Sequence, residues 1–173
     1  MRILIILLFI SFNSFGQLSY SDIMSINSVN QFKKIMIENY YEYASEEDGV
    51  IGYGYQLQKD SVDGDKASMW GAYDINSGAF VFQLSRGNAL AELFNWDDIG
   101  FNTEALKEGM GVYDEIVEDV KKNCNYYDIV TFTTEDGETN DYVCYSCSVS
   151  KYKGKLGFMI SDGAGYIRHF PNE

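Results

Sequence analysis

Six short runs of alternating apolar and polar residues constrain the fold of this chain more than any other feature. They cover residues 51–58, 66–73, 78–85, 126–134, 141–149 and 155–161. Stretches rich in Asp, Gly and Ser separate neighbouring runs within each group of three, and such stretches form turns between strands. Because short connections join antiparallel neighbours, we predict two groups of three antiparallel strands.

A helical periodicity precedes each group of strands. Residues 28–44 carry an apolar stripe, and Ser28 and Gln31 have the spacing of a capping box. A second long helix is predicted to start at Thr103, with a stripe formed by Leu106, Met110, Tyr113, Val117 and Val120. The connector between the two units is less regular and contains a short predicted helix around residues 89–94.

The order of helix and strands suggests an internal repeat. A shift of 76 residues aligns 51–94 with 127–170 without a gap and gives seven identical positions. We therefore predict an α+β fold in which a tandem αβββ repeat forms an antiparallel sheet of about six strands. Two long helices are expected on one face of this sheet, with repeat 1 at about residues 28–95 and repeat 2 at about 103–171. Unrelated strands with similar turns are the alternative.

In outline this arrangement resembles small secreted inhibitors built from two helix-plus-sheet repeats, including the β-lactamase inhibitory proteins. The chain shares no sequence motif with them, so the resemblance concerns the arrangement of elements alone.

The N-terminus has the layout of a secretory signal peptide. Arg2 precedes an apolar run from Ile3 to Ile10, and a polar stretch follows. We expect residues 1–16 to be removed and residues 17–173 to form one globular domain without membrane insertion, located in the periplasm or outside the cell. An N-terminal core strand is the alternative interpretation.

The charge balance bears on possible partners. The chain carries 26 acidic and 13 basic residues, a formal net charge of −13. Such a field repels phosphate backbones and anionic lipids, so a nucleic-acid partner is not expected. Proteins, peptides or glycans remain as partners, and solubility alone would also explain the acidity.

The three cysteines favour one disulfide. Cys144 and Cys147 lie in an alternating segment and so point to opposite faces of a strand. In an oxidising compartment Cys124 could pair with Cys147, which shares the more apolar face with Val143 and Tyr145. Three unpaired thiols are the alternative.

The sequence contains little evidence for a catalytic site. Ser161 follows an apolar run, but it lacks the surroundings of a nucleophile elbow, and His169 is the only histidine that could act as its base. A carboxylate pair could support glycoside hydrolysis, although the sequence does not single one out. A hydrolase using Ser161 and His169, or a carboxylate pair, is therefore an alternative, and no catalytic residue or cofactor is expected.

Calcium is the metal best suited to the acidic turns. Asp60, Asp63 and Asp65 fall in one turn, and hard oxygen ligands suit calcium. The spacing departs from an EF-hand, and Asp is common in turns for conformational reasons. A calcium-stabilised envelope protein is thus a further alternative, with these three residues as weak candidates.

Aromatic residues on the strands provide the leading hypothesis. Trp70 and Tyr142 oppose the more apolar alternation and are expected on the sheet face without helices. Tyr and Trp supply rigid amphipathic contact area at interfaces. We expect an exported, acidic, non-catalytic protein that binds a protein, peptide or glycan through this open aromatic face.

Overall fold

The computed structural model describes residues 18–60, 62, 64–87, 111–134 and 136–172. The predicted signal peptide, the predicted helix around residues 89–94 and the predicted start of the second helix at Thr103 lie outside these residues. The elements, in chain order, are α1 (Tyr20–Ser25), α2 (Val29–Glu38), β1 (Tyr41–Glu47), β2 (Val50–Tyr55), β3 (Met69–Asp74), β4 (Phe80–Ser85), α5 (Val112–Asn123), β5 (Asn125–Thr133), β6 (Thr139–Ser146), β7 (Lys155–Ser161) and β8 (Ala164–Phe170).

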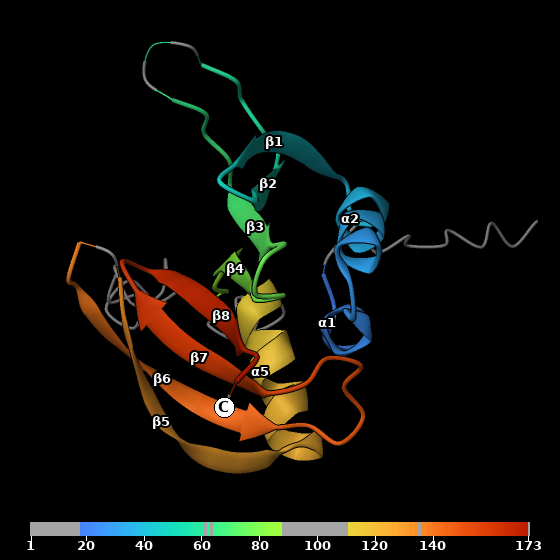
Figure 1. The fold of residues 1–173 in the computed structure, drawn as a ribbon, viewed down its shortest axis with the longest axis vertical. Coiled ribbons are helices and arrows are strands. Elements are labelled where there is room, and N and C mark those ends of the chain that lie inside the picture. Colours follow the sequence, from blue (N-terminus) through green and yellow to red (C-terminus); the bar gives the residue numbers. More distant parts are fainter. Residues whose placement is uncertain (1–17, 61, 63, 88–110, 135, 173) are drawn as a thin grey trace, which may run out of the picture.

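All eight strands form one antiparallel sheet with the order β1-β2-β3-β4-β8-β7-β6-β5 (Figure 1). The α+β class and the antiparallel sheet are thus confirmed, whereas the prediction of six strands is wrong. Strands β4 and β8 lie at the centre and join the two halves of the sheet, with Phe82 opposite Ile167. The additional strands are β1 and β8.

Strand β1 occupies residues that the sequence assigns to the first helix. Ser28 caps α2 as predicted, with its Oγ accepting from the backbone N–H of Gln31 at 3.3 Å. The helix nevertheless ends at Glu38, and Tyr40 adopts a positive φ of 60°. From Tyr41 the chain pairs with β2, so ladder hydrogen bonds and burial of Tyr41 override the helical periodicity.

Strand β8 follows the turn that the sequence places at the end of the second unit. Asp162 and Gly163 both have positive φ and connect β7 to β8 in a tight hairpin. Residues 164–170 then alternate between the two faces of the sheet, with Ile167 fully buried. The last strand predicted from the sequence is 155–161, so the sequence analysis misses this second central strand.

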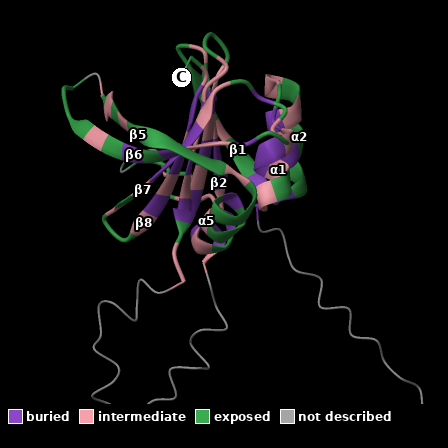
Figure 2. Cartoon of the chain, turned by 90° about the horizontal axis from the view of Figure 1, so that it is seen from below, coloured by how far each residue is buried: buried purple, intermediate pink, exposed green. Residues whose placement is uncertain are grey.

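The principal core lies between the helices and one face of the sheet. Phe82 on β4 is fully buried, with the rings of Phe32 and Phe80 both 5.8 Å away. From α5, Tyr113, Ile116 and Val120 join the same core. Buried residues on α1, α2 and α5 face the strands (Figure 2), so the helices cover one side of the sheet.

Close packing of α5 requires a glycine on β8. A Cβ built on Gly165 would lie 2.1 Å from Cγ of Tyr113, far inside van der Waals contact. The absence of a side chain lets the tyrosine ring lie on the β8 backbone, which brings the helix against the central strands.

In both halves of the described chain one helix directly precedes four strands, although the spacing between the halves differs from that of the sequence alignment. This helix is α2 in the first half, which also contains α1, and α5 in the second. β1 begins at Tyr41 and β5 at Asn125, while β4 begins at Phe80 and β8 at Ala164, a separation of 84 residues in both cases. The 76-residue alignment instead pairs β2 with β5 and β4 with β7, which hold different places in the sheet.

Candidate functional site

Ser161 and His169 lie toward opposite ends of the β7–β8 hairpin. Ser161 pairs with Ala164 beside the turn, whereas His169 pairs with Leu156. His169 is five positions after Ala164 on β8, about 16 Å at the rise of an extended strand. A general base must lie within hydrogen-bond reach of its nucleophile, so these two residues do not form a catalytic pair in this structure.

His169 instead connects two loops. Its Nδ1 lies 3.2 Å from the carbonyl oxygen of Gly78, and its Nε2 contacts the carbonyl oxygen of Lys153. The ring stacks on Phe80, with a centroid distance of 4.6 Å. Burial lowers the pKa of His169 and outweighs the two carbonyl contacts, which raise it. The geometry thus gives this histidine a structural role.

The lowered pKa of His169 predicts a pH-dependent contribution to stability. A folded-state pKa below the unfolded value means that the contribution is present above pH ~6.5 and declines as the pH falls through the folded-state pKa. Denaturant unfolding of the wild type and of His169→Gln should be compared at pH 7.5 and 5.5. We expect the wild type to lose more stability than the variant on acidification, and equal losses would contradict a histidine buried in its neutral form.

The acidic turn between β2 and β3 forms hydrogen bonds with its own backbone. The carboxylate of Asp60 accepts from the N–H of Val62 at 2.8 Å, and that of Asp65 accepts from the N–H of Asp60 at 3.2 Å. Asp63 lies outside the described residues. Among the residues that the structure describes, no group of three metal-ligating side chains occurs. Asp60 and Asp65 therefore act as turn-forming residues here.

A disulfide joins Cys124 and Cys147, the pair favoured by the strand alternation. It connects the residue after α5 to the residue after β6, with the Cα atoms 4.5 Å apart. Cys144 is buried, lies outside this disulfide and occupies the opposite face of β6. The bridge fixes the C-terminal end of α5 to the sheet and so defines one end of the space between α5 and the outer strands.

The other face of the sheet, named here the open face, carries residues that pair across neighbouring strands. One row runs from Gly54 through Trp70, Gln83 and Tyr166 to Met159. A second row, which spans the full width of the sheet, comprises Ser45, Gly52, Ala72, Val81, Arg168, Gly157, Cys144 and Asp128. No helix within the described part of the chain packs on these rows, because the helices share the core on the other face.

Arg168 lies near the middle of the open face and is held by aromatic rings. Its guanidinium carbon is 3.4 Å from the ring centroid of Phe132 and 5.9 Å from that of Phe170. Burial lowers the pKa of Arg168, while a hydrogen bond with Tyr142 favours the charged form. A cation in contact with two rings anchors this part of the open face.

Trp70 and Tyr142 both belong to the open face, but only one of them is accessible. Tyr142 is 4% exposed and forms a small second cluster with Cys144 and Phe170. Trp70 is half-buried and lies close to Gly54, where a Cβ would approach its ring to 3.3 Å. Trp70 is therefore accessible to a binding partner, whereas Tyr142 is buried and packs against Cys144 and Phe170.

Two further residues of the open face were not predicted from the sequence. Tyr166 is half-buried beside Gln83, and Arg168 is half-buried beside Val81. Both belong to β8, which the sequence analysis does not recognise as a strand. The alternation of Tyr166, Arg168 and Phe170 on one face with Ile167 and His169 on the other is the signal that could have identified them.

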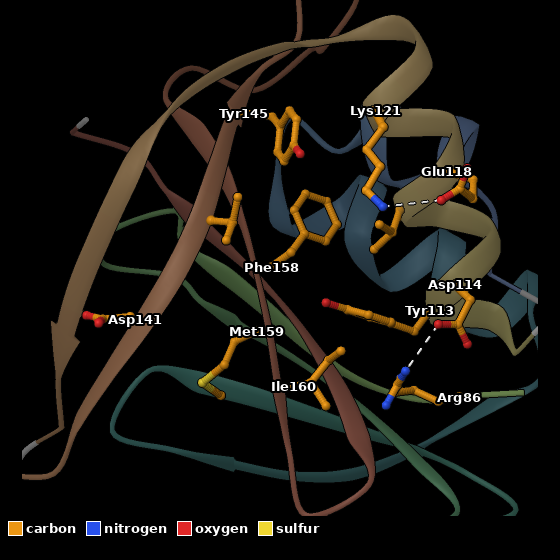
Figure 3. A pocket seen from close by; sticks show the side chains of 12 residues that line it. Arg86, Tyr113, Asp114, Glu118, Lys121, Asp141, Tyr145, Phe158, Met159 and Ile160 are labelled. Atoms are coloured by element: carbon orange, nitrogen blue, oxygen red, sulfur yellow. Dashed lines mark hydrogen bonds and ion pairs between the residues drawn. The ribbon is translucent and has the colours of Figure 1, made fainter. Parts of the chain in front are cut away.

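A groove of about 660 Å³ lies on the helix side, between α5 and strands β6 and β7 (Figure 3). Tyr113 points from α5 toward Phe158 and Ile160 on β7. Burial raises the pKa of Tyr113 to about 12, so its hydroxyl is neutral at physiological pH. This space is named the α5 groove below.

The charged groups along the α5 groove have partners. Nε of Arg86 lies 3.6 Å from Oδ1 of Asp114, and Nζ of Lys121 lies 3.3 Å from Oε1 of Glu118. Asp141 accepts a hydrogen bond from the hydroxyl of Thr131 at 2.6 Å. Each of these carboxylates therefore has a structural partner, which gives a carboxylate-pair hydrolase no specific support.

The chain matches no family model, and neither a curated protein nor a solved structure is significantly similar to it. Within the described residues, no helix has the length and apolar character needed to cross a membrane. A functional assignment therefore depends on the surfaces of the molecule itself.

Proposed function

We propose that this chain is an exported, non-catalytic protein that binds a polypeptide partner through the open face of its sheet. The observation that supports this most directly is the row formed by Trp70, Gln83 and Tyr166 on three neighbouring central strands. All three side chains are half-buried, on a face where no described helix packs. Such a row offers stacking area and an amide group to an extended or flat partner surface.

The charge of the molecule favours a basic partner. The formal net charge is −13, and Glu42 and Asp74 lie on the same face of the sheet as Trp70 and Ala72. The one arginine in the second open-face row, Arg168, is already held against Phe132 and Phe170. Complementary charge accelerates association and suppresses unsuitable partners.

Export is part of the proposal and has two supports. The first is the signal-like N-terminal sequence with Arg2 before an apolar run. The second is the disulfide between Cys124 and Cys147, because disulfides persist mainly in oxidising compartments. A tandem duplication is also proposed, with a helix and four strands as its unit, and it is supported by the succession of α2 with β1–β4 and of α5 with β5–β8.

Peptide selection tests the proposed binding face. A displayed library of random peptides would be panned against the full chain, and selected peptides would be titrated into the wild type, Trp70→Ala and Tyr166→Ala. We expect selected peptides to be enriched in Lys and Arg, and each substitution to weaken binding at least tenfold, because central aromatic anchors carry much of an interface's free energy.

Tyr43→Ala is the matched control, since Tyr43 is an exposed tyrosine on the helix side of the same sheet. Its affinity should stay within twofold of the wild type. If Trp70→Ala, Tyr166→Ala and Tyr43→Ala weaken peptide binding equally, or if none of them weakens it, binding by the open face is contradicted. A neutral oligosaccharide that displaces the peptides would assign the face to a glycan instead.

A further inference from the structure

Strand β5 forms one outer edge of the sheet and is largely exposed. Its nine residues contain one charged side chain, Asp128, and its pairing with β6 is regular over residues 128–133. Most of the strand is exposed in Figure 2. No other strand in the described part of the chain pairs with its outer side, so this edge offers backbone N–H and C=O groups to another chain.

The opposite edge, strand β1, differs from β5 in its charge and in the regularity of its pairing. Strand β1 carries three glutamates, Glu42, Glu46 and Glu47, and an irregularity in register interrupts its pairing between Tyr43 and Ser45. Charged side chains and bulges are the devices that protect an edge from strand addition. The regular part of β5 carries only Asp128 as protection.

Apolar side chains continue from the β5 edge toward the α5 groove. Ile129 pairs with Val143, which in turn pairs with Phe158 on the floor of the groove. Ile129 is 55% exposed, Val143 40% and Ile160 51%. The groove lies on the same side of the sheet as α5, so an added strand would place every second side chain next to this apolar surface.

The charges around the edge indicate the character of the incoming strand. The two cations at the groove, Arg86 and Lys121, are balanced by Asp114 and Glu118. Asp128 and Asp141 are exposed carboxylates that add negative charge to the edge region. The carboxylate of Asp128 accepts from the N–H of Ile129 at 2.8 Å, and a basic side chain of a partner could bind this carboxylate as the partner backbone approaches.

We propose that the β5 edge accepts an extended basic segment of another polypeptide as a ninth strand. Alternate apolar side chains of this segment pack on Ile129 at the edge of the apolar surface that includes Val143, while its basic side chains lie near Asp128 with their aliphatic stems on Val130. A second copy of the chain is disfavoured as the occupant, because two molecules with a formal net charge of −13 repel each other. This surface is separate from the row of Trp70, Gln83 and Tyr166.

The probe is a nine-residue peptide of alternating valine and lysine, acetylated and amidated at its ends, titrated into the full chain. We expect saturable binding, with slower hydrogen exchange of β5 backbone amides in the complex. A peptide with the same side chains but N-methylated on every residue should bind at least tenfold more weakly, because without backbone N–H groups it cannot donate to a strand ladder on either edge. A peptide with glutamate in place of lysine should also bind at least tenfold more weakly.

Two charge reversals on opposite edges localise the binding. Asp128→Lys should weaken binding at least tenfold, whereas Glu46→Lys on β1 changes the net charge equally and should leave affinity within twofold. Trp70→Ala should have no effect on this peptide, which separates the result from the proposed open-face function. Circular dichroism of both charge variants checks that each is folded.

Several results would overturn the proposal. They are equal binding of the N-methylated peptide, equal effects of the two charge reversals, and no binding at millimolar peptide. Self-association through β5, detected by sedimentation, would assign the edge to a second copy. Protection of β5 amides in the free chain equal to that of β4 would mean that the edge is already occupied.

Discussion

Replacing Phe82 with alanine is expected to destabilise the protein by about 3–5 kcal/mol, the usual cost of removing a buried phenylalanine ring. Phe82 is fully buried and lies on a central strand that joins the two halves of the sheet. Phe32 from α2 and Phe80 from the same strand contact its ring. The loss therefore combines the transfer of the ring to water with a cavity at the centre of the core. Urea unfolding followed by circular dichroism measures the change in free energy.

Ile37→Ala serves as the control for the Phe82 variant. Ile37 is 64% exposed on α2, and substitutions at exposed positions usually change stability by less than about 0.5 kcal/mol. If Phe82→Ala costs no more than Ile37→Ala, the core does not pass through the β4–β8 junction as described.

Removing the disulfide is expected to cost about 3 kcal/mol of stability. The bridge spans 23 residues, and closure of a loop of this length in the unfolded chain accounts for that magnitude in the chain-entropy model. For a chain of this size, about 3 kcal/mol corresponds to a decrease in Tm of roughly 6–12 °C. The double variant Cys124→Ser/Cys147→Ser should show this decrease by differential scanning calorimetry.

A reducing agent provides the matched comparison for the disulfide variant. Dithiothreitol should lower the Tm of the wild type toward that of the double variant and leave the variant unchanged. Cys144 is buried and remains in both proteins, so it does not account for a difference between them. If dithiothreitol does not lower the Tm of the wild type, and the double variant has the same Tm as the wild type, the bridge does not stabilise the protein.

The six strands predicted from the sequence correspond to β2, β3, β4, β5, β6 and β7. These runs are bounded by turns and alternate in polarity, which is a local property that sequence reasoning detects well. β1 and β8 escaped detection because each also fits another local pattern. Tyr40 and Tyr43 continue the helical stripe of α2, and the residues after Gly163 follow a turn near the end of the chain.

The candidate surfaces were predicted only in part. Trp70 and Tyr142 do lie on the face without described helices, because alternation along a strand fixes which residues share a face. Alternation does not show that Phe170 and Arg168 from β8 cover Tyr142. The α5 groove depends on where α5 crosses the sheet, which no local pattern encodes.

Local sequence patterns are enough to predict the fold class, the positions of most strands, the helical cap at Ser28 and the faces on which the cysteines lie. These features depend on residues close together in the chain, through turn chemistry, side-chain alternation and capping hydrogen bonds. By contrast, the pairing of β4 with β8, the burial of Tyr142 and the position of β5 at an outer edge follow only from the three-dimensional arrangement. Local patterns do not reveal them, because ladder hydrogen bonds are chemically alike for every pair of strands. The order of strands, and with it the surfaces available to partners, is therefore decided by how side chains distant in sequence pack in one core.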